Sequence, residues 1–303
     1  MSFYVQFLGT GSALPTVNHH PTSQYIFCQN RHFLIDCGEG TQIQLRKRSV
    51  KIQKLDAIFI SHMHGDHYFG LVGLLSSMHL LGREKSISIY GPEVLETIVR
   101  MQLELGGASL NFEVVFHAIA DKFEGLLFED KVLEIKTFKL KHKIPTHGFV
   151  FKEKVKERHL IAAKFKESGL SLLQIPDLKA GKDVTDEQGK VHSFKTYTKK
   201  PKPSSSYAFC SDTTYSESIL PWINGVDVLY HEATFTNKDK ARAKATLHST
   251  AEQAAKIARM AKVGKLYFGH LSARYDDAEV HLKEAKVHFE NCFEAVEGEI
   301  VKL

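Results

Sequence analysis

The chain has 303 residues, of which 43% are hydrophobic and 25% charged, and its formal net charge is +5. This composition is ordinary for a soluble globular protein with an ample core. No apolar run approaches the roughly 18 residues that a membrane-spanning helix needs, which excludes an integral membrane protein. The start of the chain lacks a basic segment and a cleavage site, so we expect a cytoplasmic protein without a membrane partner.

The N-terminal half predicts short strands separated by turns. Alternating apolar residues predict a first strand over 3–7, and two apolar runs around Gln29-Asn30-Arg31 predict a hairpin. A third strand ends at Ser61. Beyond it the pattern predicts helices over 69–81 and 93–105, and strands over 86–90, 111–118 and 133–142. The helix over 69–81 is rich in leucine, which suits either a core or a subunit interface.

The composition changes over approximately 152–202. This segment contains 13 Lys/Arg and 7 Asp/Glu, a net charge of +6. This exceeds the net charge of the whole chain, so the remainder is slightly acidic. We interpret the segment as a basic insertion rather than an independent domain. A localised positive charge fits a polyanionic partner, and the alternative is a solvated lysine-rich loop. We expect Phe165, Phe194 and Tyr197 to pack the insertion internally.

The C-terminal third alternates strands and helices. Strands are predicted over 207–211, 226–230 and 266–270, with a last one near Ala295. Ser249 and Glu252 have the spacing of a capping box at the start of an alanine-rich helix, and a second helix is predicted over 276–289. The four cysteines are scattered without a C-x-x-C pair, so we expect them to be buried thiols rather than disulfides.

The segment His62-Met-His-Gly-Asp-His67 directly follows an apolar strand and combines three imidazoles with a carboxylate. These side chains suit Zn²⁺ and related divalent metals. Side chains alternate along an extended segment, so His62 and His64 point the same way. Asp66 and His67 follow a glycine and can face a second metal. The sequence therefore favours a site for two metals over a merely polar loop.

Other predicted strands also end in residues of the kinds that bind metals. His142, Asp212, the pair His231-Glu232 and His270 each close or follow such a strand. Ligands bind at strand ends in sheets of this kind. Taken alone, His142 would more often be ordinary surface or core polarity. Asp212 could be a helix N-cap, and His270 could be structural. Two metals need about seven or eight donors, which makes convergence on the His62–His67 segment the better interpretation.

These segments together resemble the metallo-β-lactamase superfamily and, within it, the ribonuclease Z family of tRNA 3′-processing endonucleases. The resemblance spans residues 3 to about 290 and is carried by Leu8–Ser12, Asp36–Gln42, His62–His67, His231–Phe235, His248-Ser-Thr and Gly269–Tyr275. It implies an α/β fold, a four-layer αβ/βα sandwich formed by the whole chain, with an inserted protruding arm at approximately 152–202.

The resemblance also implies a ligand set for two Zn²⁺ per subunit. One zinc would be held by His62, His64, His142 and Asp212, and the other by Asp66, His67, Asp212 and His270, with Asp212 bridging. Asp66 would accept the proton of the attacking water. His248, oriented by Glu232, would donate a proton to the leaving oxygen, and His231 would make a structural hydrogen bond.

The implied partner is precursor tRNA, gripped by the basic arm, and the implied assembly is a homodimer. Hydrolysis after the discriminator base would leave a tRNA 3′-hydroxyl and a trailer 5′-phosphate. Two alternatives stay open. One is a phosphodiesterase on the same scaffold that acts on cyclic nucleotides or other small esters. The other is an RNA-binding scaffold without catalytic activity.

Overall fold

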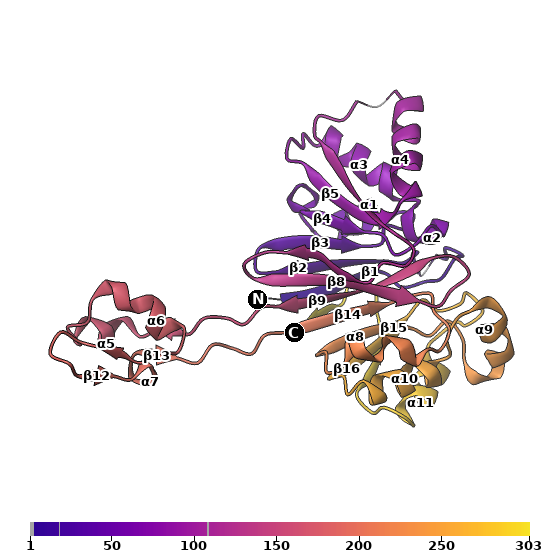
Figure 1. The fold of residues 1–303 in the computed structure, drawn as a ribbon. Coiled ribbons are helices and arrows are strands. Elements are labelled where there is room, and N and C mark those ends of the chain that lie inside the picture. The colour runs from indigo at the N-terminus through magenta and orange to yellow at the C-terminus, as the bar shows by residue number, and fades with distance from the viewer. Residues whose placement is uncertain (1–2, 18, 108) are drawn as a thin grey trace. The chain divides into compact units, whose positions relative to one another are not determined.

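The computed structural model describes residues 3–17, 19–107 and 109–303. The chain divides into two compact units, Met1–Lys152 together with Ser205–Leu303, and Glu153–Ser204. The larger unit contains two seven-stranded sheets that pack face to face (Figure 1). No helix among the described residues is long and apolar enough to cross a membrane.

The first sheet has the strand order β18-β1-β2-β3-β4-β5-β6. Its N-terminal strands pair antiparallel, whereas β3 to β6 run parallel and are joined through helices. The strands are β1 (Phe3–Gly9), β2 (Ser23–Cys28), β3 (Arg31–Ile35), β4 (Ala57–Phe59), β5 (Ile87–Pro92), β6 (Val114–Ile119) and β18 (Ile300–Lys302).

The second sheet has the order β17-β16-β15-β14-β9-β8-β7. Strands β14 to β17 run parallel, so their carboxyl ends lie at one edge of the sheet. The strands are β7 (Gly125–Glu129), β8 (Leu133–Leu140), β9 (Thr146–Glu153), β14 (Ser206–Cys210), β15 (Val228–Glu232), β16 (Lys265–Gly269) and β17 (Cys292–Glu294).

Helices cover the outer face of each sheet (Figure 1). The first sheet is covered by α1 (Thr41–Lys47), α3 (Leu71–Leu80) and α4 (Val94–Leu105). The second is covered by α8 (Leu220–Ile223), α10 (Ala251–Met260) and α11 (Glu279–Lys286). Two further short helices, α2 (Gly65–Tyr68) and α9 (Lys240–Thr246), lie in connections near the strand ends. The layers are therefore helix, sheet, sheet and helix, which confirms the predicted four-layer α/β fold.

The apolar strands explain this layering. In β4 the side chain of Phe59 enters the core between the sheets, whereas its neighbour Ile58 packs under the helices. A strand that is covered on both faces reads as a continuous apolar run rather than an alternating one. On the other side, alanines of α10 let that helix pack closely on the second sheet.

The smaller unit has its own apolar cluster of Phe165, Leu170, Leu178 and Val184. Phe194 and Tyr197 pack against this cluster, so the expectation of internal packing is confirmed. The elements are β10 (His159–Leu160), α5 (Ala162–Lys166), α6 (Ile175–Lys179), β11 (Val184–Thr185), β12 (Val191–His192), α7 (Phe194–Tyr197) and β13 (Thr198–Lys199).

The predicted capping box is wrong by one residue. Thr250, not Ser249, is the N-cap of α10, and it pairs reciprocally with Gln253. The hydroxyl of Ser249 instead donates to the carbonyl oxygen of Thr213. The four cysteines are free and buried, as expected.

Strand β9 has no counterpart among the predicted elements, because His147 and Gly148 interrupt its apolar pattern. Gly148 is required there, since a Cβ would lie 2.5 Å from the ring of Phe138 and 2.9 Å from the carbonyl oxygen of Phe209. A glycine inside a strand often marks such a close approach.

Candidate metal centre

The predicted ligands come from four strand ends of the two sheets. The segment His62–His67 follows β4, His142 follows β8, Asp212 follows β14 and His270 follows β16. His64 has an extended backbone, and α2 begins at Gly65. This change of backbone directs the first two histidines and the Asp66-His67 pair to different donor groups.

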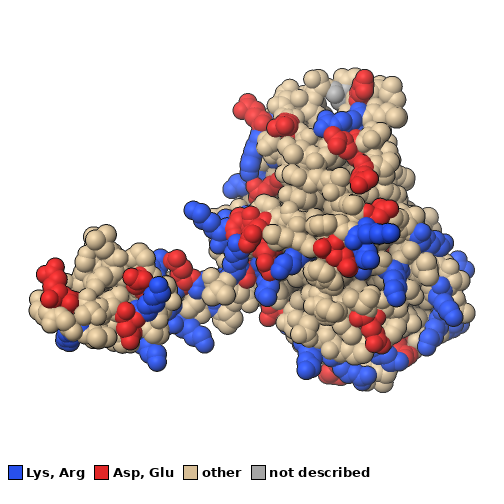
Figure 2. All heavy atoms as spheres, viewed as in Figure 1, with Lys and Arg blue, Asp and Glu red and all other residues tan. Residues whose placement is uncertain are grey.

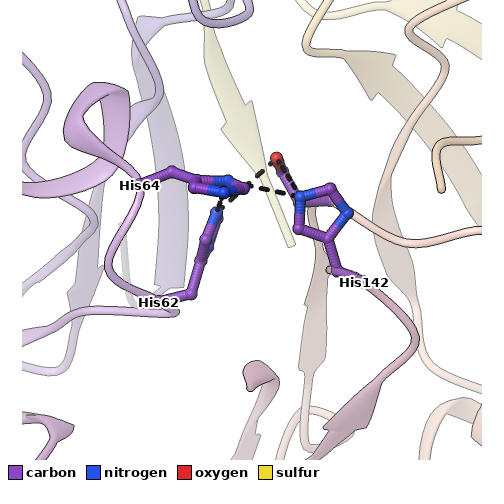
Figure 3. A group of neighbouring side chains, drawn as sticks. His62, His64 and His142 are labelled. Atoms are coloured by element: carbon purple, nitrogen blue, oxygen red, sulfur yellow. Dashed lines mark hydrogen bonds and ion pairs between the residues drawn. The ribbon is translucent and has the colours of Figure 1, made fainter. Parts of the chain in front are cut away.

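The first donor group contains His62, His64, His142 and Asp212. Nδ1 of His64 lies 3.0 Å from Nε2 of His62 and 3.3 Å from Nε2 of His142 (Figure 3). Oδ2 of Asp212 lies 3.6 Å from both of those Nε2 atoms. The three imidazoles and the carboxylate oxygen therefore enclose one small space.

The second donor group contains Asp66, His67 and His270. Oδ2 of Asp66 lies 3.3 Å from Nε2 of His67 and 3.4 Å from Nε2 of His270. Oδ1 of Asp212 lies 3.2 Å and 3.1 Å from the same two nitrogens. Asp212 thus offers one oxygen to each donor group.

The residues present fit two zinc ions. Four donors at the usual zinc distances in a tetrahedron lie about 3.3 Å from one another. The eight separations given above lie between 3.0 and 3.6 Å, and all donor atoms within each group lie within 4.8 Å of one another. Nε2 of His67 is buried and lies within 3.3 Å of carboxylate oxygens of Asp66 and Asp212. A cation among these three atoms would be held by one nitrogen and two oxygens, which are ligand types that zinc accepts.

The protonation states of the first donor group suit metal binding. Burial lowers the pKa values of His62, His64 and His142, so these imidazoles are neutral and can coordinate. Burial alone would raise the pKa of Asp212, but His270 and His67 hold it well below its usual range. The ligand carboxylate is therefore ionised.

In the second donor group, burial alone would lower the pKa of His67, but the carboxylates of Asp212, Asp66 and Asp36 raise it well above its usual range. This imidazole must therefore release a proton when it binds a metal.

Asp36, to which the sequence analysis assigned no role, supports the second donor group. Its Oδ2 lies 2.6 Å from Nδ1 of His67, and Ser61 donates to the same carboxylate from its amide and its hydroxyl. Such a hydrogen bond fixes the orientation of a ligating imidazole and makes it a better donor. The sequence could have identified Asp36 as a candidate, because this residue also directly follows an apolar strand.

Two further ligands, His142 and His270, are oriented through their second ring nitrogens. Nδ1 of His142 lies 3.0 Å from the carbonyl oxygen of Leu247, and Nδ1 of His270 lies 2.9 Å from the hydroxyl oxygen of Thr234. Three residues of the centre have left-handed backbones, Asp36 (φ 53°), Asp212 (φ 52°) and His270 (φ 59°). Strained conformations of this kind persist where the surrounding structure over-determines them, and they cluster at functional sites.

His248 lies beside the two donor groups and is paired with Glu232. Its Nδ1 lies 2.8 Å from Oε1 of that carboxylate, which is fully buried and also accepts from the amides of Thr213 and Ser249. Burial alone would lower the pKa of His248, but Glu232 raises it to about 9. Glu232 itself, although buried, has its pKa lowered to about 2 by His248. The pair is therefore a charged imidazolium held by a carboxylate.

His231 is buried, and its Nδ1 donates to the carbonyl oxygen of Glu232 at 2.7 Å, which is the structural hydrogen bond expected for it.

A cavity of about 710 Å³ opens over the centre. It is lined by the ligands His64, Asp66, His142, Asp212 and His270, and also by His248. Three cations, Lys143, Arg242 and Arg274, line its rim and are exposed. None of the three forms an ion pair with any residue in the described part of the chain. The cavity thus combines a metal-binding floor with a positively charged entrance.

Fold and centre define the chain as a metallo-β-lactamase-fold hydrolase, and solved structures agree with this class. The human tRNase Z, short form, superposes with a TM-score of 0.72 at 26% identity, covering 99% of this chain and 98% of that one. The metallo-β-lactamase fold protein YhfI from Bacillus subtilis has a TM-score of 0.69 at 18% identity and covers 99% of this chain, which shows the fold alone.

Curated relatives narrow the class. The Ribonuclease Z of Parabacteroides distasonis is 43% identical over 98% of this chain and 97% of its own length, and that of Azobacteroides pseudotrichonymphae is 44% identical over 99% of both chains. Residues 3–166 also match the family described as Anti-Pycsar protein Apyc1. The chain belongs to the ribonuclease Z family and is a metal-dependent endoribonuclease.

Proposed function

We propose that this protein is a zinc-dependent endoribonuclease that removes the 3′ trailer from precursor tRNA by hydrolysis after the discriminator base. The observation that carries the proposal is the division of the two Asp212 oxygens between two donor groups, within one cavity that also contains His248. We assign His62, His64, His142 and Asp212 to one zinc, and Asp66, His67, Asp212 and His270 to the other.

When bound, two zinc ions supply the Lewis acidity that makes water reactive at neutral pH and offsets the charge on the phosphate. The side chains supply the proton transfers. Asp66 stays ionised, because His67 and His270 keep its pKa low despite burial, and it accepts the proton of the attacking water.

His248 donates a proton to the 3′ oxygen of the discriminator nucleotide as the bond from that oxygen to phosphorus breaks. Glu232 holds Nδ1 of the ring, which leaves Nε2 for the substrate. The products are a tRNA 3′-hydroxyl and a trailer 5′-phosphate. A carboxylate that maintains a protonated imidazole is the arrangement that general acid catalysis requires.

The charge distribution supports a nucleic-acid substrate. The three rim cations suit the phosphates on either side of the scissile bond. The smaller unit, Glu153–Ser204, contains 12 Lys/Arg and 7 Asp/Glu, and we propose that it binds tRNA through backbone phosphates. Figure 2 shows Lys and Arg in blue and Asp and Glu in red on the surface of this smaller unit.

We also propose a cytoplasmic homodimer. Leu71, Leu74 and Met78 of α3 are core residues, whereas Leu80 and Leu81 at its C-terminal end are exposed. Adjacent exposed leucines favour a subunit contact. Sedimentation of the zinc-loaded protein tests this, and a single monomer species at micromolar concentration would contradict it.

The function is tested with a 3′-extended precursor tRNA, incubated with and without a chelator, with the cut mapped to the nucleotide. We expect one metal-dependent cut after the discriminator base. Hydrolysis of cyclic nucleotides or small phosphodiesters without precursor cleavage would favour the phosphodiesterase alternative. Binding of the RNA without any cleavage by metal-loaded protein would favour the non-catalytic scaffold.

A further inference from the structure

Phe69 is a large apolar side chain that faces the cavity over the metal centre. It directly follows α2, three residues after Asp66, and lines the same cavity as Asp66, His64 and His248. Its relative exposure is 65%, although most aromatic side chains of this unit are buried. An exposed aromatic ring in a cavity lined by charged groups gains no free energy from the fold unless a ligand covers it.

The ring packs on one side against neighbouring residues. One side of it lies against Gly65, so closely that any side chain at residue 65 would overlap it. The backbone amide of Phe69 donates to the carbonyl oxygen of Gly65 at 2.8 Å. The ring of Tyr68 meets it edge to face, with the centroids 5.0 Å apart. A ring held in this way loses little conformational entropy when a ligand packs on its open side.

The surroundings define the ligand that this ring suits. The metal ligands place the reacting phosphate near Asp66, and the rim cations Arg242 and Arg274 suit the neighbouring phosphates. A flat aromatic group attached to that phosphate chain can reach a ring three residues from Asp66. Proteins that bind single-stranded RNA stack unpaired bases on Phe, Tyr or Trp in this manner.

We propose that Phe69 is a stacking platform for the unpaired nucleobase next to the scissile phosphate. This inference rests on the proposed function. Two bases have the required chemistry, the discriminator base and the first base of the trailer. Stacking of either base holds the chain across the cavity, with the scissile phosphate between the two donor groups.

The test uses zinc-loaded full-length protein and precursor tRNAs that carry 2-aminopurine either at the discriminator position or at the first trailer position. Fluorescence quenching is recorded in the binding phase that precedes cleavage. The variants are Phe69→Leu, which keeps an apolar side chain without a π face, and Phe69→Trp, which restores the face. Phe123→Leu is the matched control, because Phe123 is 41% exposed and does not line the cavity.

We expect wild-type protein and Phe69→Trp to quench 2-aminopurine at one of the two positions, and the quenched position identifies the stacked base. Phe69→Leu should lose the quenching and raise KM for the precursor about 5- to 100-fold, as stacking energies per base predict. Phe123→Leu should behave as wild type. Zinc content and the unfolding midpoint of each variant serve as checks on the fold.

Unchanged quenching and KM in Phe69→Leu would overturn the proposal. It would also be overturned if Phe69→Leu sedimented as a monomer where the wild type is a dimer, because the ring would then serve a subunit contact. Failure of the wild type to cleave the precursor would instead contradict the proposed function.

Discussion

At the scale of single residues, the chemistry of the centre depends on how each donor is held. The two oxygens of Asp212 face different donor groups, and its left-handed backbone turns the chain sharply after β14. Asp36 does not line the cavity, but its carboxylate binds Nδ1 of His67 and so orients a metal donor. A carboxylate at a strand end therefore serves as a donor in one case and orients a donor in the other.

The role of His248 as a proton donor can be tested by removing its imidazole. His248→Ala should slow cleavage of precursor tRNA by about 10²–10⁴-fold, as expected for loss of a general acid, while tRNA affinity changes far less. Single-turnover rates and equilibrium binding measure the two effects separately. An equal loss of rate and affinity would identify His248 as a binding or structural residue.

The pairing of His248 with Glu232 makes a prediction about pH. A general acid acts only when protonated, so the rate falls as pH rises through its pKa. Glu232 raises the pKa of His248, and a neutral amide at this position would lower it. The alkaline limb of the rate–pH profile should therefore move to lower pH in Glu232→Gln.

A suitable control is Glu252→Gln, the same change at a glutamate that contacts Lys256 and Asn237 rather than His248. Its profile should match that of the wild type. If the alkaline limb does not move in Glu232→Gln, the group that titrates there is not His248.

At the scale of elements, α9 connects the cavity rim with the ligands. Its exposed cations are Lys240, Arg242 and Lys244, of which Arg242 alone lines the cavity. On the visible face, Lys and Arg side chains gather where α9 lies (Figures 1 and 2). The residue after α9, Leu247, accepts the hydrogen bond that orients His142. Contacts between RNA and α9 therefore lie next to the support of a metal ligand.

Three substitutions that each remove one positive charge from α9 can distinguish a direct contact between Arg242 and a phosphate from a general attraction of RNA to the positive charge of the helix. Arg242→Gln should weaken precursor binding and reduce the slope of log affinity against log salt concentration by about 0.7. Lys240→Gln and Lys244→Gln change the net charge equally but should leave the slope nearly unchanged. Equal slopes in all three variants would mean that Arg242 makes no phosphate contact.

The sequence predicted elements best where one physical signal dominated. Apolar runs such as 57–60 identified core strands, and the strand ends pointed to His142, Asp212 and His270. Strand β9 was missed because Gly148 weakened its pattern, and the packing constraint that requires this glycine is set by Phe138 and Phe209 in the neighbouring strands β8 and β14. The supports from Thr234 and Leu247 were also missed, since a hydroxyl or a backbone carbonyl near a ligand leaves no periodic signal in a sequence.

At the scale of the whole molecule, the chain separates a hydrolytic unit from a small unit with its own apolar cluster. The metal donors, His248 and Glu232 all belong to the larger unit. The smaller unit, Glu153–Ser204, contains 12 Lys/Arg and 7 Asp/Glu. Its positive charge suits binding of RNA rather than chemistry.

Replacement of residues 153–204 by a short glycine–serine linker tests this division. We expect loss of precursor tRNA cleavage, with hydrolysis of a small chromogenic phosphodiester retained, because the donors remain in place. Zinc content of the shortened protein confirms that the centre is intact. Precursor cleavage at the wild-type rate would exclude the smaller unit from tRNA binding.

The most direct test of the account is the zinc content of the purified chain, measured by mass spectrometry for the wild type and for Asp212→Ala. Two donor groups that share one carboxylate predict two zinc ions per chain in the wild type. They also predict the loss of both ions, with nearly all activity, in the variant. One ion or fewer in the wild type, or two ions retained without Asp212, would contradict a shared dinuclear centre.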